Sequence, residues 1–153
     1  MLRALVDTNV WVSALLNPHG FPARVLEALK AEQFTLILSE PLLEELLDVL
    51  SRPRLVKKYH LEPRDIAELA ALLEEKAISV KPQGEFHLCR DPRDDVVLET
   101  ALLGRADYAV SRDDDLKRDL DLMKKMQEQG VRVVSVSEFL RIVEVLPFRK
   151  EQE

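Results

Sequence analysis

Short aliphatic runs alternate with longer segments of helical periodicity along this chain, and that alternation restricts its fold more than any other feature. Strands are predicted where aliphatic and β-branched side chains form runs of strand length, over residues 2–6, 34–38, 78–80, 108–111 and 131–136. Helices are predicted over residues 22–31, 39–50, 54–59, 63–77, 94–103 and 116–129 and from residue 138 onward, with Ser39 and Ser137 as caps. This alternation predicts the α/β class, with a five-stranded, mainly parallel sheet flanked by helices on both faces.

The length and composition of the chain are those of one globular unit. Its 153 residues are 46% hydrophobic and 33% charged, which supplies enough apolar side chains for a core. The sequence shows no internal repeat and no linker. We therefore predict one domain over residues 1–146, followed by a polar tail over residues 147–153 whose end is frayed.

Several classes of protein are disfavoured by residues that the sequence lacks. Its four glycines lie too far apart for a dinucleotide-binding loop or a Walker phosphate-binding loop. A single cysteine forms no internal disulfide, and one cysteine with three histidines makes a zinc cage implausible. No apolar run approaches the ~18 residues that span a membrane, so we expect a cytoplasmic protein with no membrane partner.

The net charge by itself argues against a nucleic-acid partner. The chain has 22 lysines and arginines against 28 aspartates and glutamates, which gives a formal charge of -6. Proteins that coat nucleic acid without regard to sequence rely on lysine and arginine to displace counterions from the phosphates. The positions of the acids, however, carry more information than their number.

Four acidic residues are predicted to lie at one edge of the sheet. Asp7 follows the first strand directly, and Asp113 comes two residues after the fourth strand. Asp94 opens a helix after a loop, and Glu45 lies in a helix that starts from the same edge. Functional groups of parallel α/β sheets gather beyond the carboxyl ends of the strands. Each acid taken singly also fits a turn, a helix cap or a solvated face.

Such a group of carboxylates indicates a bound cation. Two carboxylates ~4 Å apart repel by about 4 kcal/mol at an effective dielectric constant of ~20, so a cluster needs a cation or a raised pKa. Oxygen ligands without histidine or cysteine favour Mg²⁺ or Mn²⁺. The chemistry that suits one or two such ions is hydrolysis of a phosphodiester, in which the metal activates water and neutralises charge on the phosphate.

The four segments that contain these acids are LVDTNV (5–10), LLEEL (42–46), CRDPRDD (89–95) and YAVSRDDDL (108–116). They resemble motifs of the PIN-domain ribonucleases, most closely the VapC-like toxin components of toxin-antitoxin pairs, and the likeness extends over residues 2–140. The resemblance implies a five-stranded parallel sheet and metal-dependent cleavage of single-stranded RNA. It also implies an antitoxin partner and a homodimer.

The resemblance assigns a role to individual residues of this sequence. Asp7, Glu45, Asp94 and Asp113 match the catalytic and metal-binding acidic quartet, Asp115 matches an additional metal ligand, and Asn9 and Ser111 match supporting polar positions. Ser111 stands where many relatives have threonine, which keeps the hydroxyl. Glu44 beside Glu45 and Asp95 beside Asp94 leave a one-residue ambiguity at two positions. Asp94 is favoured because it is placed to start the helix.

A basic segment near the Glu45 helix is a candidate for RNA binding. It contains Arg52, Arg54, Lys57, Lys58 and Tyr59, with no acid between Ser51 and Leu61, and Tyr59 is available to stack a base. A solvated basic face explains the segment equally well. Arg90, Arg93 and Arg112 are alternative phosphate contacts. The alternative to a ribonuclease is a catalytically silent scaffold of the same fold that binds a protein partner or a metal ion.

Overall fold

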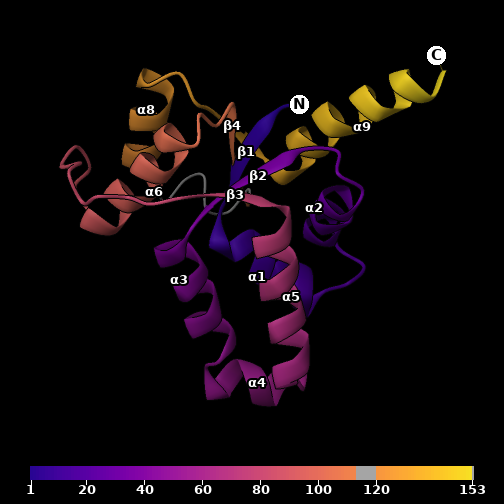
Figure 1. The fold of residues 1–153 in the computed structure, drawn as a ribbon. Coiled ribbons are helices and arrows are strands. Elements are labelled where there is room, and N and C mark those ends of the chain that lie inside the picture. Colours follow the sequence, from indigo (N-terminus) through magenta and orange to yellow (C-terminus); the bar gives the residue numbers. More distant parts are fainter. Residues whose placement is uncertain (113–119, 153) are drawn as a thin grey trace.

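The order of strands and helices along the chain follows the predicted alternation (Figure 1). A computed structural model describes the backbone of residues 1–112 and 120–152, and the side chains as far as residue 144. Its elements are β1 (Arg3–Val6), α1 (Thr8–Leu16), α2 (Phe21–Lys30), β2 (Thr35–Ser39), α3 (Glu40–Leu50), α4 (Pro53–Tyr59), α5 (Pro63–Lys76), β3 (Ala77–Val80), α6 (Pro92–Leu103), β4 (Tyr108–Ser111), α8 (Leu120–Glu128), β5 (Arg132–Ser135) and α9 (Val136–Gln152). Each strand begins and ends within one residue of its predicted bounds.

The five strands form one parallel sheet in the order β3-β2-β1-β4-β5. The central strand β1 pairs with β2 on one side and with β4 on the other, so that Leu5 lies opposite both Ile37 and Ala109. The chain first builds the sheet outward through β2 and β3 and then returns to add β4 and β5. The switch point of this topology lies between β1 and β4, where parallel α/β sheets bind their ligands.

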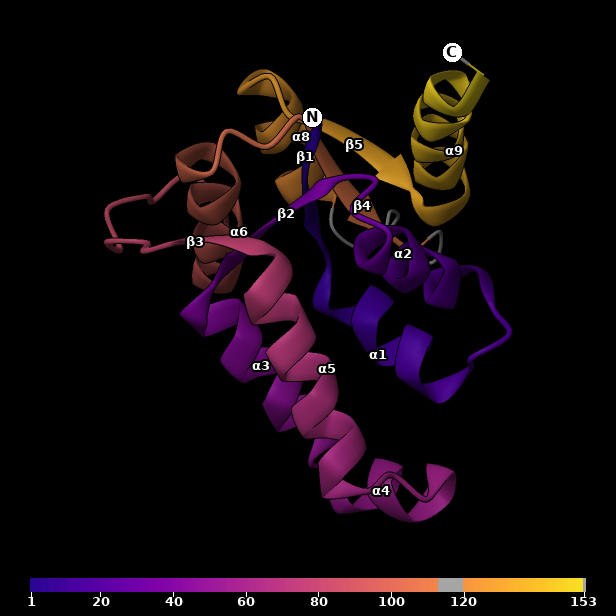
Figure 2. The same ribbon diagram turned by 45° about the vertical axis from the view of Figure 1, so that its right-hand side comes forward.

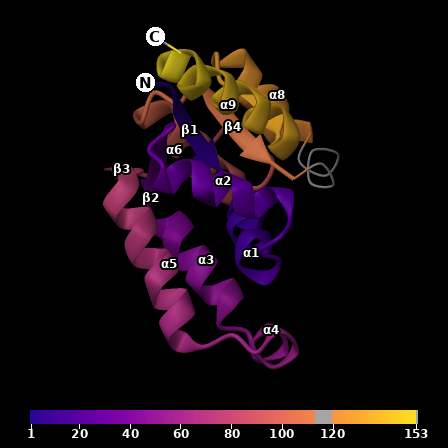
Figure 3. The same cartoon turned by 90° about the vertical axis from the view of Figure 1, so that its right-hand side faces the viewer.

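Helices cover both faces of the sheet, as predicted. Figure 2 shows α6 and α8 on one face and α2 and α9 on the other, with α1 next to α2. The helices α3 and α5 extend beyond the sheet side by side, and α4 joins them at their far end (Figures 1 and 3). In the core, the buried ring of Phe139 from α9 meets Phe34 edge to face, with ring centroids 4.9 Å apart.

Two helices begin earlier than their sequence pattern predicts. Helix α6 begins at Pro92 rather than Asp94, because the Asp91 carboxylate accepts the Arg93 backbone N–H and Pro92 fits the first turn. The cap of α9 is Ser135 rather than Ser137. Its hydroxyl accepts the Glu138 N–H at 3.2 Å, while the Glu138 carboxylate accepts the Ser135 N–H at 3.4 Å, which is a capping box.

The last helices also differ in extent from the prediction. Helix α9 continues to Gln152 and so includes most of the segment 147–153 that the sequence assigns to a polar tail. Helix α8 covers residues 120–128 of the predicted helix 116–129, of which residues 116–119 lie outside the described part of the chain. Within the described residues, no helix combines the length and the hydropathy that a membrane span requires.

Candidate active site

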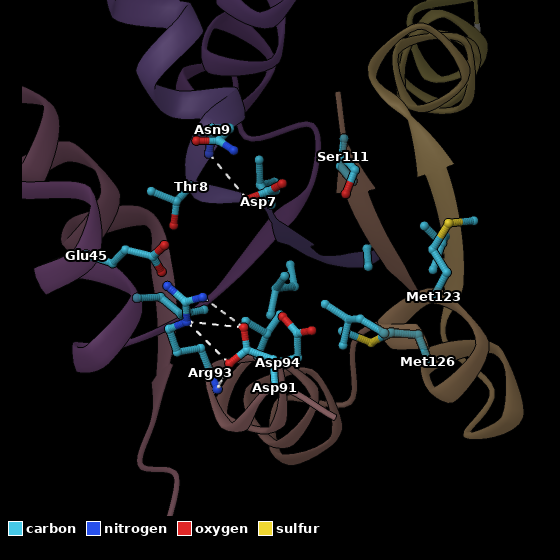
Figure 4. Close-up of a pocket in the computed structure, with 18 residues that line it drawn as sticks. Asp7, Thr8, Asn9, Glu45, Asp91, Arg93, Asp94, Ser111, Met123 and Met126 are labelled. Carbon is cyan, nitrogen blue, oxygen red and sulfur yellow. Dashed lines mark hydrogen bonds and ion pairs between the residues drawn. The ribbon is translucent and has the colours of Figure 1, made fainter. Parts of the chain in front are cut away.

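A cavity of about 220 Å³ opens at the carboxyl ends of β1 and β4, at the switch point of the sheet (Figure 4). Four elements beside it contribute polar side chains, namely Asp7, Thr8 and Asn9 after β1, Glu45 from α3, Asp91, Arg93 and Asp94 from the start of α6, and Ser111 from β4. The opposite wall is apolar and includes Met123 and Met126 of α8. The structure thus brings Asp7, Glu45 and Asp94 to one cavity.

Asp7 is fixed by its position between β1 and α1. Its backbone N–H donates to the carbonyl of Val110 in β4 at 2.9 Å, which holds the residue at the switch point. Its carboxylate caps α1 by accepting the Asn9 N–H at 3.3 Å. Asp7 is therefore both a helix cap and a cavity residue.

The structure separates Glu45 from its neighbour Glu44. Both side chains are exposed, so burial does not distinguish them. Glu45 lines the cavity together with Leu42, one turn before it on α3, whereas Glu44 is not among the described residues that line it. Helical rotation of about 100° per residue turns the two carboxylates in different directions.

Asp94 and Asp95 also point to different surroundings. Asp94 lines the cavity, whereas Asp95 is buried at 7% exposure and accepts the backbone N–H groups of Leu88 and Cys89 at 2.9 and 2.8 Å. The hydrogen bond from the Cys89 backbone N–H is the main cause that holds the pKa of the Asp95 carboxyl below its usual range. Asp95 thus fastens the loop that leads into α6.

A second buried acid of α6 holds the same loop, and the sequence did not predict this role for either acid. Glu99, one turn after Asp95, is 3% exposed and accepts the backbone N–H of Gln83 and, at 3.1 Å, that of Gly84. The sequence does contain one indication of this shared role, because the spacing of four between Asp95 and Glu99 places both acids on one face of the helix.

The thiol of Cys89, which lies beside Asp95, has a raised pKa. Burial raises the pKa of this thiol to about 12, so that the thiol is protonated at neutral pH.

Asp91 and Arg93 form an ion pair at the mouth of the cavity. The Arg93 Nη2 and Nε groups lie 2.9 and 3.2 Å from Asp91 Oδ2, and this bonding holds the pKa of the Asp91 carboxyl below its usual range. The Arg93 side chain is 90% exposed. Asp91 was not predicted as a site residue, although the Asp-Pro step marks it as a helix cap.

The remaining predicted site residues are placed as follows. Asn9 and Ser111 line the cavity. The Arg112 guanidinium donates to the Ser13 hydroxyl of α1 at 3.2 Å. Asp113 and Asp115 lie outside the described residues.

The predicted RNA-binding segment does not line the cavity. It lies in and beside α4, at the far end of the α3 and α5 pair (Figure 3). Arg52 is 3.6 Å from Asp48, and the Lys58 ammonium lies 5.3 Å from the centre of the Tyr59 ring. No described residue of α4 is buried, so its basic side chains are open to solvent.

The donor set of the cavity fits a hard divalent cation. Asp7, Glu45 and Asp94 offer only oxygen atoms, which Mg²⁺ and Mn²⁺ prefer. Among the described side chains, however, no three histidines, cysteines, aspartates or glutamates converge closely enough to form a ready metal site. The chemistry of the donors therefore supports a metal, while the cation itself would have to draw the carboxylates together.

The fold and the cavity define a PIN-domain protein. Residues 3–115 match the PIN domain family, and the chain belongs to that family. PIN domains are in general nucleases that use divalent metal ions. This chain is 27% identical over 141 residues to the uncharacterised protein MJ1680 of Methanocaldococcus jannaschii, across 91% of this chain and 90% of the relative.

A solved structure shares the fold. This structure is VapBC2 from Rickettsia felis, crystallised bound to a DNA fragment from the VapBC2 promoter. One of its chains superposes with a TM-score of 0.52 over 88% of this chain and 98% of its own length. The two sequences are 14% identical. The likeness to this VapBC2 chain therefore lies in the fold.

Proposed function

We propose that the protein is a Mg²⁺- or Mn²⁺-dependent endoribonuclease that hydrolyses phosphodiester bonds of single-stranded RNA as the toxin of a toxin-antitoxin pair. The observation that supports this proposal most is the meeting of Asp7, Glu45 and Asp94, from three separate elements, in one cavity of a PIN-domain chain. Asp113 and Asp115 complete the proposed ligand set by resemblance.

The residues that line the cavity have different roles in the proposed reaction. A bound divalent ion would supply the charge that activates water and neutralises the phosphate oxygens. Asp7, Glu45 and Asp94 would hold that ion, and the α1 cap keeps the Asp7 carboxylate in place. Asn9 and Ser111 supply polar atoms beside Asp7, and the apolar wall of Met123 and Met126 limits the access of water from the other side.

The decisive experiment compares matched acid variants. The parent should cleave single-stranded RNA in Mg²⁺ or Mn²⁺ and stop in EDTA, and the pattern of cuts on an RNA pool would identify the site. Asp7→Asn and Glu45→Gln should lose RNA cleavage while they stay folded. Glu44→Gln removes the same charge from the neighbouring residue and should keep RNA cleavage. Undiminished cleavage by Asp7→Asn would contradict the catalytic assignment.

The same variants separate an enzyme from a scaffold. A catalytically silent scaffold would cleave no RNA under any metal condition. Calorimetric titration with millimolar Mn²⁺ adds an independent measurement, since the nuclease should bind the ion through the cavity acids. A parent that neither binds Mn²⁺ nor cleaves RNA would favour the scaffold.

An antitoxin is the proposed protein partner. The fold resemblance to a VapBC2 chain supports this proposal. Such a partner should place a basic side chain or a helix against the cavity acids and cover them. Co-expression with the neighbouring open reading frame should yield a complex without ribonuclease activity, and a neighbour that does not bind would favour a stand-alone nuclease.

A homodimer is proposed on the resemblance of the sequence to the VapC-like PIN-domain ribonucleases. Sedimentation at micromolar concentration should give about twice the mass of one 17.5 kDa chain. A monomeric sedimentation coefficient over that range would contradict the dimer.

The basic side chains of Arg52, Arg54, Lys57 and Lys58, together with Tyr59, are proposed to contact RNA away from the cavity. Glu45 and Leu50, the last residue of α3, are five residues apart, so α4 begins beyond a point about 7.5 Å along the axis of α3 by the rise of a helix. Only RNA longer than a few nucleotides would then reach both regions. Lys57→Ala and Lys58→Ala should weaken the binding of long strands and leave that of dinucleotides unchanged.

A further inference from the structure

We propose that Arg93, held in place by Asp91, binds a phosphate of the RNA strand at the mouth of the cavity. This inference rests on the proposed ribonuclease function and names the residue that positions the substrate. Of the arginines adjacent to predicted metal ligands, Arg93 is the one whose side chain lines the cavity.

The hydrogen bonds of Arg93 leave part of its guanidinium open. Asp91 Oδ2 accepts from Nε and Nη2, at 3.2 and 2.9 Å, and Asp91 Oδ1 lies 3.3 Å from Nε. The guanidinium carries five N–H donors in a rigid planar fork. Asp91 occupies one edge of the fork, and no other described residue accepts from Nη1 or from the second hydrogen of Nη2.

The open edge of the fork faces the site. Figure 4 shows the guanidinium beside Asp91 and turned toward Glu45. Among the described residues that line the cavity, Arg93 is the only basic one, and it stands among Asp7, Glu45 and Asp94. A phosphate that approaches these carboxylates is repelled, and a cation at the entrance offsets that repulsion. The planar fork matches the oxygen atoms of a phosphate.

Stability does not explain the position of this arginine. Arg93 lies in the first turn of α6, where the helix dipole disfavours a positive charge. Its ion pair with Asp91 is exposed, and exposed pairs contribute little to folding. A residue that opposes a local rule beside a cavity is expected to serve function.

The test measures RNA affinity in an Asp7→Asn background, in which the labelled single-stranded RNA stays intact. Arg93→Ala should raise the Kd about 10-fold or more, as expected for a lost hydrogen bond to a charged group. The slope of log K against log salt should fall by about 0.7, because one phosphate contact is lost. The matched control is Arg132→Ala, which removes the same charge from an exposed position at the start of β5, at the opposite edge of the sheet.

A double-mutant cycle tests the part played by Asp91. Asp91→Asn keeps a residue that caps helices well but loses the ion pair, so it should weaken RNA binding less than Arg93→Ala does. Combining the two should weaken binding no further than Arg93→Ala alone, because Asp91 acts through Arg93. Arg93→Lys should restore the salt slope and only part of the affinity, since lysine keeps the charge without the fork.

The outcomes separate this inference from the function on which it rests. Equal RNA affinities and salt slopes for Arg93→Ala and Arg132→Ala would overturn the role of Arg93. The ribonuclease function would still be supported if the parent cleaves RNA with metal and Asp7→Asn does not. A parent that neither binds nor cleaves RNA would overturn both. In the cleavage-competent protein, Arg93→Ala should raise KM more than it lowers kcat, which a purely structural role would not produce.

Discussion

At the scale of single residues, the acids of this chain serve two distinct purposes. Asp7, Glu45 and Asp94 face the cavity, while Asp95, Glu99 and Asp121 accept backbone N–H groups of the loop before α6. The sequence predicted the first group, because each of those acids follows a strand, opens a helix after a loop or lies in a helix that starts at the carboxyl edge of the sheet. It favoured Asp94 over Asp95 but left a one-residue ambiguity, since neighbouring residues on a helix differ only in direction and the loop that Asp95 holds has no sequence pattern.

Substituting these two neighbours should separate catalysis from stability. Asp95→Ala leaves the Leu88 and Cys89 N–H groups without their acceptor, and it should lower the melting temperature by about 5 °C or more. Asp94→Ala should lower the melting temperature less and abolish cleavage. Thermal unfolding by circular dichroism and an RNA cleavage assay check the pair. A larger loss of stability in Asp94→Ala would reverse the two assignments.

At the scale of elements, the strands were predictable and several helix starts were not. Strand β4 matches its predicted range, because the aliphatic run between polar neighbours is short and clear. Helix α1 lacks an amphipathic period, since Thr8, Val10, Trp11, Val12 and Ala14 are all buried, so no pattern in the sequence marks its bounds. The caps Asp91 and Ser135 compete in sequence with Asp94 and Ser137, and the local bonds that decide between them, to the Arg93 N–H and with Glu138, are seen only in the structure.

The hydroxyl of Ser39 shows how packing overrides a local preference. Ser39 occupies the cap position of α3, yet its buried hydroxyl lies 2.9 Å from that of Thr100 on α6 instead of capping the helix. The Thr100 hydroxyl donates to the Val96 carbonyl at 2.7 Å, so Ser39 donates to Thr100. This pair joins α6 to the end of β2.

Breaking this pair from one side should cost more than removing both hydroxyls. Thr100→Val leaves the Ser39 hydroxyl buried without its acceptor, and should cost about 1–3 kcal/mol in the free energy of unfolding. Ser39→Ala combined with Thr100→Val should cost less than the sum of the single changes. Urea unfolding of the three variants measures the coupling, and strictly additive losses would contradict it.

Close packing of α6 on β2 depends on a residue without a side chain. A Cβ atom at Gly104, which ends α6, would lie 2.2 Å from Ile37 Cγ2 in β2. Gly104→Ala should therefore destabilise the protein by about 1–3 kcal/mol through overpacking, as measured by urea unfolding. In an Ile37→Ala background the same change should cost much less, because the opposing atoms are gone. An equal cost in both backgrounds would contradict the steric explanation.

At the scale of the whole molecule, the strand order determines where the site lies. The order β3-β2-β1-β4-β5 places the ends of β1 and β4 side by side, so that Asp7 and Ser111 meet although they are far apart in sequence. The sequence predicted a parallel sheet and its functional edge. The position of the basic segment was not predictable from the sequence, because the distance of α4 from the cavity depends on how far α3 and α5 extend beyond the sheet.

The net charge of -6 is compatible with an RNA substrate if a cation neutralises the cavity acids. Because that cation would also remove the repulsion between the carboxylates, the stability of the fold should depend on metal. Mn²⁺ at 100 times its Kd should stabilise the parent by about 2.7 kcal/mol, which raises the melting temperature by about 5–10 °C. Asp7→Asn should lose most of that increase and, in EDTA, should melt above the parent, because one repelling charge is gone. Glu44→Gln should keep the full increase, since its side chain lies outside the described cavity lining. Equal Mn²⁺ shifts in all three proteins would show that the ion binds dispersed surface acids instead of the cavity.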